Sequence, residues 1–229
     1  ASFTMPTQTY GDISAKVTPM LASTEQFIDT NLSITFDAEI TAGTNGQIRI
    51  YDDTDTLVDT IFSASEVDEL GYTGQDKHRV VDFTPLTFEG NTLTIKLHNN
   101  VLEYGKNYYV AISEGVVTGA KLNGIDFVGL GKTSEWKFST KAAMPSLDAS
   151  NVTVGKATSN DFASLQGALN FAMQQDKNHA TTISIDAGTY NELLFLRNRN
   201  NLTIKGAGQD NTVIQYDNYE TFNSGSGKS

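Results

Sequence analysis

Short stretches of β-forming residues recur along the last eighty or so residues of the chain, and one helical stretch precedes most of them. The β-forming stretches are residues 152–154, 182–185, 193–196, 202–205 and 212–216. The later ones each follow a polar corner built from Asn, Gly, Asp or Arg. Strands of this length that recur about every ten residues after a helix predict the capped start of a right-handed parallel β-helix.

The helical stretch has the spacing of an amphipathic helix. Its apolar stripe consists of Phe162, Leu165, Leu169, Ala172 and Met173, which follow the three-four period of an α-helix. One of the residues 159–161 (Ser, Asn, Asp) is expected to cap its N-terminus. We expect this helix to cover the first coil, because an open solenoid end exposes backbone groups and an apolar interior.

The first part of the chain has a different pattern. Alternating stretches separated by turns predict strands at residues 32–36, 47–51, 57–62, 79–83, 92–97, 108–112 and 136–138. Asn45-Gly46 and Gly90-Asn91 lie between such stretches and have the chemistry of hairpin turns. Seven or so short strands of this kind indicate a two-sheet sandwich.

Four short pieces of this first part resemble the bacterial Ig-like domains. They are Thr18-Pro19, residues 34–36, residues 104–110 and residues 136–140. The resemblance implies a spacer or support module. Among the aromatic residues, Tyr108 is expected to be a tyrosine-corner residue. Residues 141–150 are small and polar and read as a linker, so we expect an Ig-like β-sandwich over residues 1–145 and the start of a β-helix over residues 146–229. The predicted fold class is therefore mostly β.

The second part resembles the pectinesterase (pectin methylesterase) family. Three pieces carry the likeness: residues 152–154 leading through Asp161-Phe162 to residues 165–169; the Gly188-x-Tyr190-x-Glu192 signature with Leu196; and residues 202–206 followed by 212–214. Asp186 and Ser184 depart from the usual family residues. The resemblance implies an exported enzyme that hydrolyses methyl esters of galacturonan, with no cofactor.

Ester hydrolysis needs a nucleophile, a proton donor for the leaving methanol and donors facing the oxyanion. The family takes these groups from later coils, and no residue here maps onto them, so catalytic residues are expected beyond residue 229 and this chain alone is expected to be inactive. Tyr190, Glu192 and Arg197 are the candidate substrate-binding residues. Each also has a structural interpretation, in corner packing or as a solvated turn.

Two other functions stay open. A non-catalytic module could bind glycans or a surface through the flat face of a β-helix, and a pectate lyase-like enzyme would use Ca²⁺ and an arginine base. The motifs of the following coils would distinguish the three: Gln and Asp motifs favour the esterase, and a carboxylate cluster with Arg favours the lyase.

Charge and composition narrow the partners. The formal net charge is −11, which disfavours nucleic acid and anionic membranes because both require a basic face. There is no cysteine and no apolar run of membrane-spanning length. We expect pectin or a related polygalacturonan as partner, a secreted, periplasmic or cell-surface location, no membrane insertion, and self-association through the open β-helix end.

Three smaller groups of residues, the clustered aspartates, the aromatic residues and the histidines, have simple structural interpretations. The carboxylates of Asp52, Asp53 and Asp55 could attract a hard cation, but they lack the glycine of an EF-hand loop, so a solvated hairpin end is expected and no metal. Tyr72, Tyr108, Tyr109 and Trp136 could stack on sugars, although core positions are the simpler interpretation. The three histidines lie far apart in the sequence, so a histidine-based site is not expected.

Overall fold

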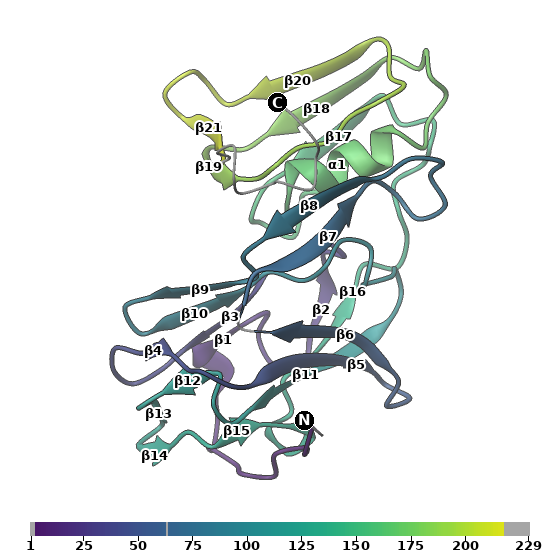
Figure 1. Ribbon diagram of the computed structural model, residues 1–229. Coiled ribbons are helices and arrows are strands. Elements are labelled where there is room, and N and C mark those ends of the chain that lie inside the picture. Colours follow the sequence, from purple (N-terminus) through teal and green to yellow (C-terminus); the bar gives the residue numbers. More distant parts are fainter. Residues whose placement is uncertain (1–2, 63, 218–229) are drawn as a thin grey trace. The chain divides into compact units, whose positions relative to one another are not determined.

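The computed structural model of the chain describes residues 3–62 and 64–217 (Figure 1). These residues divide into two compact units. Unit 1 comprises Ala1–Gln26, Asn31–Glu66 and Phe83–Ala142, and unit 2 comprises Phe27–Thr30, Val67–Asp82 and Ala143–Ser229. The boundary between residues 145 and 146 stays a prediction, because unit 2 also includes two segments from earlier in the chain.

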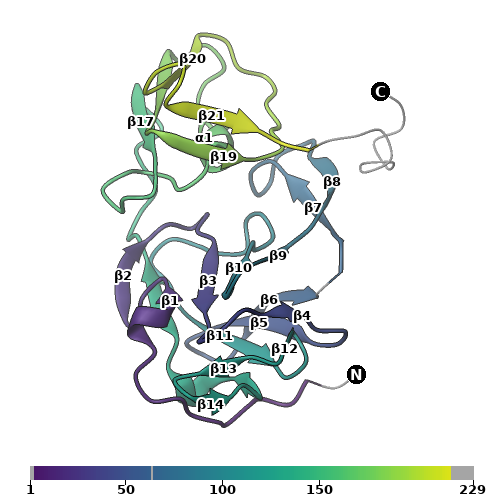
Figure 2. The same cartoon turned by 90° about the vertical axis from the view of Figure 1, so that its left-hand side faces the viewer.

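Unit 1 is built on two sheets (Figure 2). The first has the order β1 (Val17–Thr18), β3 (Leu32–Thr35), β10 (Thr92–Ile95), β9 (Leu86–Glu89). The second has the order β2 (Ser23–Gln26), β16 (Lys137–Thr140), β11 (Asn107–Ser113), β5 (Gln47–Asp52), β6 (Leu57–Phe62), and β15 (Gly129–Leu130) also pairs with β11. The pairs are antiparallel except for β2 with β16, which is parallel.

Smaller elements complete unit 1. They are the pair β4 (Thr41–Ala42) with β12 (Val117–Thr118), the pair β13 (Lys121–Leu122) with β14 (Ile125–Asp126), and the 3₁₀ helices η1 (Ser14–Lys16) and η2 (Lys132–Ser134).

The core of unit 1 follows from alternation along the strands. In β5, Ile48 and Ile50 are fully buried while Arg49 between them is not. The first sheet supplies equally buried side chains from Leu32, Ile34 and Leu93. Alternate residues of a strand point to opposite faces, so one apolar face of each sheet forms the core. All seven predicted strands of this part of the sequence are present, some with ends shifted by one or two residues. The strand at residues 79–83, however, lies outside the two sheets and mostly in unit 2, so its predicted place in the sandwich was wrong.

The two predicted hairpin turns had different outcomes. Gly90-Asn91 joins β9 to β10, whose end residues Glu89 and Thr92 pair directly, so this prediction is confirmed. The prediction for Asn45-Gly46 was wrong, because β4 before it pairs with β12, and β5 after it pairs with β6 and β11. The chain bends at this position, but pairing with distant strands decides which partners the flanking strands have.

The large aromatic residues of unit 1 lie in its interior. Tyr108, Tyr109 and Trp136 are buried, so the alternative that they form a sugar-stacking face was wrong. The Trp136 indole Nε1 donates to the Pro19 carbonyl at 2.9 Å. The Tyr108 hydroxyl oxygen accepts from the Glu103 amide at 2.9 Å, five residues upstream, which confirms the tyrosine-corner interpretation. Tyr72 lies in unit 2 and is partly buried.

Unit 2 contains parallel strands. Strand β18 (Thr181–Ile185) pairs in parallel with β17 (Asn151–Val154) on one side and with β20 (Leu202–Gly206) on the other. Strand β19 (Gly188–Asn191) pairs in parallel with β21 (Thr212–Gln215). Strands β7 (Glu66–Leu70) and β8 (Arg79–Phe83), most of whose residues belong to unit 2, form a separate two-stranded sheet.

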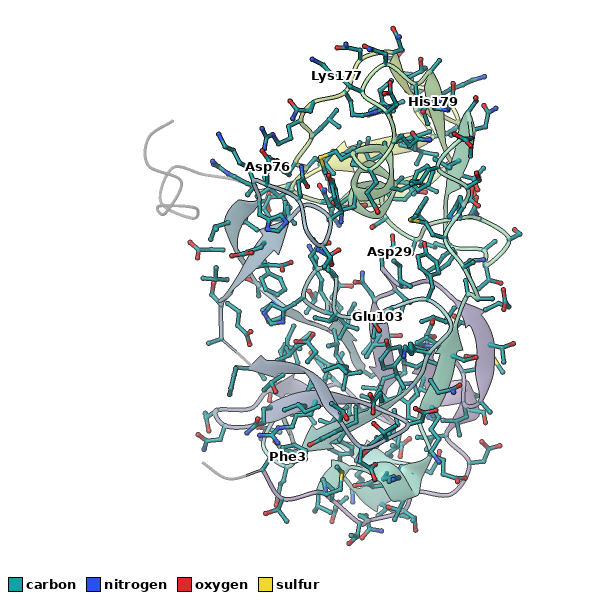
Figure 3. The ribbon with its side chains drawn as sticks, turned by 90° about the vertical axis from the view of Figure 1, so that its right-hand side faces the viewer. Phe3, Asp29, Asp76, Glu103, Lys177 and His179 are labelled. Atoms are coloured by element: carbon teal, nitrogen blue, oxygen red, sulfur yellow. The ribbon has the colours of Figure 1, made fainter. Side chains whose placement is uncertain are left out.

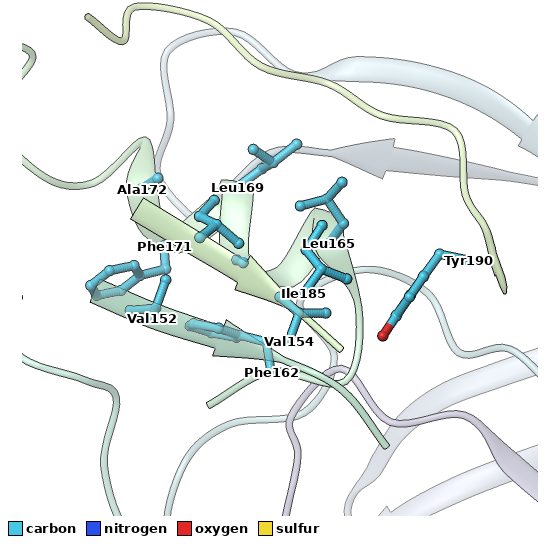
Figure 4. Close-up of a cluster of buried hydrophobic side chains, with 11 residues drawn as sticks. Val152, Val154, Phe162, Leu165, Leu169, Phe171, Ala172, Ile185 and Tyr190 are labelled. Atoms are coloured by element: carbon cyan, nitrogen blue, oxygen red, sulfur yellow. The ribbon is translucent and has the colours of Figure 1, made fainter. Parts of the chain in front are cut away.

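Helix α1 (Leu165–Ala172) packs on β17 and β18 and closes the core of unit 2 (Figure 4). The predicted stripe is confirmed in that Phe162, Leu165 and Leu169 are buried together with Val152, Val154 and Ile183. The strands contribute Val and Ile and the helix contributes Leu and Phe to one apolar cluster.

The predicted helix cap was wrong by a few residues. Ser164 is the N-cap, and its hydroxyl accepts from the Gly167 amide. The earlier candidates bond elsewhere, because the Asp161 carboxylate accepts from the Thr153 amide and the Asn160 side-chain amide donates to Asp186 and to the Ala157 carbonyl. Phe162 lies before the helix, where it forms an isolated parallel bridge with Val154.

The strand predicted at residues 193–196 was also wrong, since the second strand of this region is β19. The Phe195 amide donates to the Gln166 side-chain oxygen at 2.7 Å, and the Gln166 side-chain nitrogen donates to the Phe195 carbonyl. A side chain of α1 therefore satisfies the backbone that a neighbouring strand would otherwise pair. Leu194 and Leu196 are exposed.

Candidate functional site

The candidate substrate-binding residues come from β19 and from the segment after it. Tyr190 is on β19, Glu192 follows the strand directly, and Arg197 lies farther along the same segment. Tyr190 is buried, and its hydroxyl donates to the Asp186 carbonyl at 3.1 Å. Burial raises the pKa of Tyr190, and the carboxylates of Asp186 and Glu192 add to the rise. Tyr190 is therefore a neutral packing residue at the edge of the unit 2 core.

Glu192 binds the N-terminus of α1. Its Oε1 accepts from the Leu165 amide at 2.9 Å, and its Oε2 accepts from the Gln166 amide at 2.8 Å. These amides are two of the donors that a helix leaves unpaired at its start. A carboxylate is favoured at this end because the helix dipole is positive there. The structure thus gives Glu192 an anchoring position, and substrate contact by it stays a prediction.

A second carboxylate, from a distant part of the chain, lies at the same helix end. Asp29, labelled in Figure 3, accepts from the Ala163 amide at 3.1 Å, the Ser164 amide at 2.8 Å and the Ser164 hydroxyl at 2.6 Å. Withdrawal from water raises the pKa of Asp29, and the hydrogen bonds from Ser164 and Ala163 oppose that rise. Sequence analysis missed Asp29, because no local pattern connects it to a helix that begins more than a hundred residues later.

Gly167 makes room for this carboxylate. A Cβ atom on Gly167 would lie 2.2 Å from Oδ2 of Asp29, far inside van der Waals contact. Glycine inside a helix ordinarily costs about 0.5 to 1 kcal/mol relative to alanine. The position is therefore explained by the approach of Asp29, which the bare helix pattern could not indicate.

Arg197 belongs to an ion pair. Its Nη1 lies 2.8 Å from Oδ1 of Asp76, and the Asp76 carboxylate is largely exposed. Asp76 belongs to the segment between β7 and β8, so this contact too was invisible to local sequence patterns. The predicted set is divided by these contacts: Tyr190 and Glu192 lie at the helix and core, and Arg197 is paired with a solvent-exposed carboxylate.

The cluster of carboxylates after β5 forms a hydrogen-bonded turn. Oδ1 of Asp52 accepts from the Thr54 amide and hydroxyl and from the Thr56 amide, at 2.7 to 2.9 Å. These donors, the Thr54 hydroxyl first, lower the pKa of Asp52. Lys132 and the Tyr109 hydroxyl hydrogen-bond to Asp55 and lower its pKa. Within the described residues, no group of three or more His, Asp or Glu side chains has the arrangement of a metal site.

The histidines contact different carboxylates and carbonyls. His98 lies between Asp59 and Glu66, with Nδ1 2.8 Å from Asp59 and Nε2 3.0 Å from Glu66. His78 pairs with Glu69, and His179 contacts the Ala149 carbonyl. Both ring nitrogens of His98 face carboxylates that only accept when ionised, so the imidazolium is the form that donates to both. This cluster fastens β6 to the start of β7.

A pocket of about 330 Å³ lies in unit 1 beside β2, β11 and β16. Ser23, Asn107, Lys132 and Lys137 are among its lining residues. The Lys132 ammonium is already paired with Asp55, and Lys137 is 3.9 Å from Glu135. The lysines at the rim thus have internal partners, and no sequence motif had indicated this position.

Comparison with known proteins identifies part of the chain. Residues 13–140 match the family described as bacterial Ig-like domain. No curated protein and no solved structure matches the chain. Between residue 3 and residue 217, leaving out residue 63, there is also no helix with the length and apolar character of a membrane span.

The contact between Gly167 and Asp29 gives a double-mutant test. We expect Gly167→Ala to destabilise α1 in the wild-type chain, because the new methyl group meets the Asp29 carboxylate. In an Asp29→Ala chain, itself destabilised by about 1 to 2 kcal/mol through loss of a cap, the same substitution should stabilise α1 by about 0.5 to 1 kcal/mol. Amide hydrogen exchange of α1 measures both. If Gly167→Ala changed the stability of α1 in the same direction in both chains, the approach of Asp29 would not be the reason for the glycine.

The depressed pKa of Asp52 gives a pH test. Because the folded-state pKa lies below the unfolded value of about 4, Asp52 stabilises unit 1 above that pH, and the contribution is lost as the pH falls through the folded-state pKa. Wild type should therefore exceed Asp52→Asn in stability at pH 7, and the difference should shrink as the pH falls below the unfolded-state pKa of about 4 and through the lower folded-state pKa. Urea unfolding followed by Trp136 fluorescence measures this. Asp53→Asn is the charge-matched control. A stability difference that does not change with pH would contradict the claim that the ionised Asp52 carboxylate stabilises this turn.

Proposed function

We propose a function for a chain that belongs to the bacterial Ig-like domain family: it is the N-terminal part of an exported pectinesterase, in which the Ig-like domain supports the start of a parallel β-helix. The substrate of the whole protein would be methyl-esterified galacturonan. The catalytic coils are expected beyond residue 229, so this chain would contribute support and the first coils and would not itself carry out the ester hydrolysis.

The parallel, in-register stacking of unit 2 is the observation that carries the proposal. Val152 pairs with Ile183, and Ile183 pairs with Ile204, so one aliphatic column runs through three strands. Tyr190 pairs with Ile214 in the second stack. Successive strands of one chain that pair in parallel, with like side chains above one another, are the arrangement that a β-helix repeats.

The family signature also has a physical role in this arrangement. Tyr190 packs in the core, and Glu192 binds the amides at the start of α1. Together they connect the second stack to the helix that covers the first strands. This arrangement would explain why a tyrosine and a glutamate occur two residues apart at this position.

The Ig-like domain supports an exported location. Domains of this family are often extracellular or surface-associated, and the chain as a whole is acidic, with a formal net charge of −11. An acidic module beside a galacturonan-acting domain would repel the anionic, de-esterified product more than the neutral, methylated substrate, over about 10 Å at ordinary salt.

The catalytic part of the proposal is tested on the natural protein that carries this chain. We expect it to release methanol from highly methylated pectin, and residues 1–229 alone to release none. De-esterified polygalacturonate is the control substrate, because it has no methyl ester to cleave. Formation of unsaturated uronides without release of methanol would indicate a lyase in place of the esterase. Binding to pectin without formation of any product would indicate a glycan-binding module in place of an enzyme.

Substrate binding is tested at Arg197. Tyr190 and Glu192 have their polar atoms engaged, whereas the exposed Asp76 partner of Arg197 could be exchanged for a uronate carboxylate. We expect Arg197→Ala to weaken retardation of the chain in gels containing polygalacturonate by up to about fivefold, the size of one exposed ion pair.

Asp76→Ala is the matched control for this experiment, because it breaks the same ion pair while leaving the arginine in place. It should preserve or strengthen the retardation, since it removes the competing carboxylate. If both substitutions leave the retardation unchanged, Arg197 has only the structural role that the ion pair gives it.

A further inference from the structure

The apolar columns of unit 2 become exposed at their outer strands. In the column of Val152, Ile183 and Ile204, the exposed fractions are 1%, 0% and 44%. In the second stack, Tyr190 is 9% exposed and its partner Ile214 is 41% exposed. The outermost members thus have the side chains of core residues and the exposure of surface residues.

The backbones of these outer strands are open as well. Strand β20 is the last strand of the order β17-β18-β20, and β21 is the outer strand of its pair with β19. Within residues 3–62 and 64–217, no strand pairs with the far edge of either. Each edge therefore presents a row of backbone donors and acceptors that a further strand could bind.

These edges lack the features that ordinarily prevent strand addition. Edge strands are commonly protected by charges, proline or bulges. Lys205 is the single charged residue of β20, β21 has none, neither strand contains proline, and both pair in continuous register with their inner neighbours. The chain as a whole has a net charge of −11, but these two strands carry almost none of it. An uncharged strand can therefore pair with them without burying a charge.

We propose that β20 and β21 form a docking edge for one further rung, a polypeptide segment whose two short strands add in parallel with Val, Ile or Leu over Ile204 and Ile214. Continuity with the existing ladders supports this occupant, because β20 stacks on β18 and β21 on β19 in the same way. The inference uses the parallel stacking of the proposed function and is independent of its catalytic part.

A synthetic peptide with the sequence of residues 201–216 is the probe, since it is the segment that already stacks on β18 and β19. Fluorescence anisotropy of the labelled peptide with the whole chain should show saturable binding. Hydrogen exchange should slow at the amides of β20 and β21 in the complex. We expect Ile204→Lys or Ile214→Lys in the chain to weaken binding at least tenfold.

Two controls make the result specific. Met20→Lys places the same charge at another exposed apolar residue, in unit 1, and should leave binding unchanged. A peptide with Ser at the positions of Ile204 and Ile214 should not bind. Equal binding by this peptide or by the Ile204→Lys chain would overturn the proposal, as would unchanged exchange at β20 and β21.

The other occupant of the edge would be a second copy of the chain. Concentration-dependent dimers in sedimentation velocity that Ile204→Lys abolishes, together with no peptide binding, would overturn the single-rung proposal in favour of self-association. Pectin is absent from all of these measurements, so their failure leaves the proposed enzymatic function standing, and failure of the methanol assay leaves the docking edge standing.

Discussion

The start of α1 is the contact on which unit 2 depends. A helix leaves its first amides without internal partners, and here Ser164, Glu192 and Asp29 accept from all of those between residues 163 and 167. The three acceptors come from three separate parts of the sequence. The start of one short helix therefore holds both the loop before β3 and the residue that follows β19, and the same helix packs on the parallel strands.

This concentration of acceptors explains features that otherwise have no common cause. Gly167 is small because Asp29 approaches the helix there. Residues 193–196 leave the strand conformation because Glu192 turns toward α1 and Gln166 takes both backbone groups of Phe195. Polar interactions around the helix thus decide local conformation where the apolar pattern alone would have favoured another strand.

The sequence was sufficient where the determining information was local. Alternation along β5 and β11, the two-residue turn at Gly90-Asn91 and the apolar stripe from Phe162 to Leu169 each depend on neighbours a few residues away. The sequence was insufficient where a contact joins distant residues, as Asp29 does with Ser164 and Asp76 with Arg197. The cap at residues 159–161 failed for a related reason, since Asn160 and Asp161 had stronger partners in Asp186 and Thr153.

The range of the family match and the boundaries of the two compact units differ. Residues 27–30 and 67–82 lie inside the matched range of 13–140 but belong to unit 2. A recombination event that moved residues 13–140 into another gene would carry Asp29 away from the helix that it caps, and would leave the amides of Ala163 and Ser164 behind without an acceptor. The two halves of this gene are therefore expected to be inherited together, as a single unit of exchange.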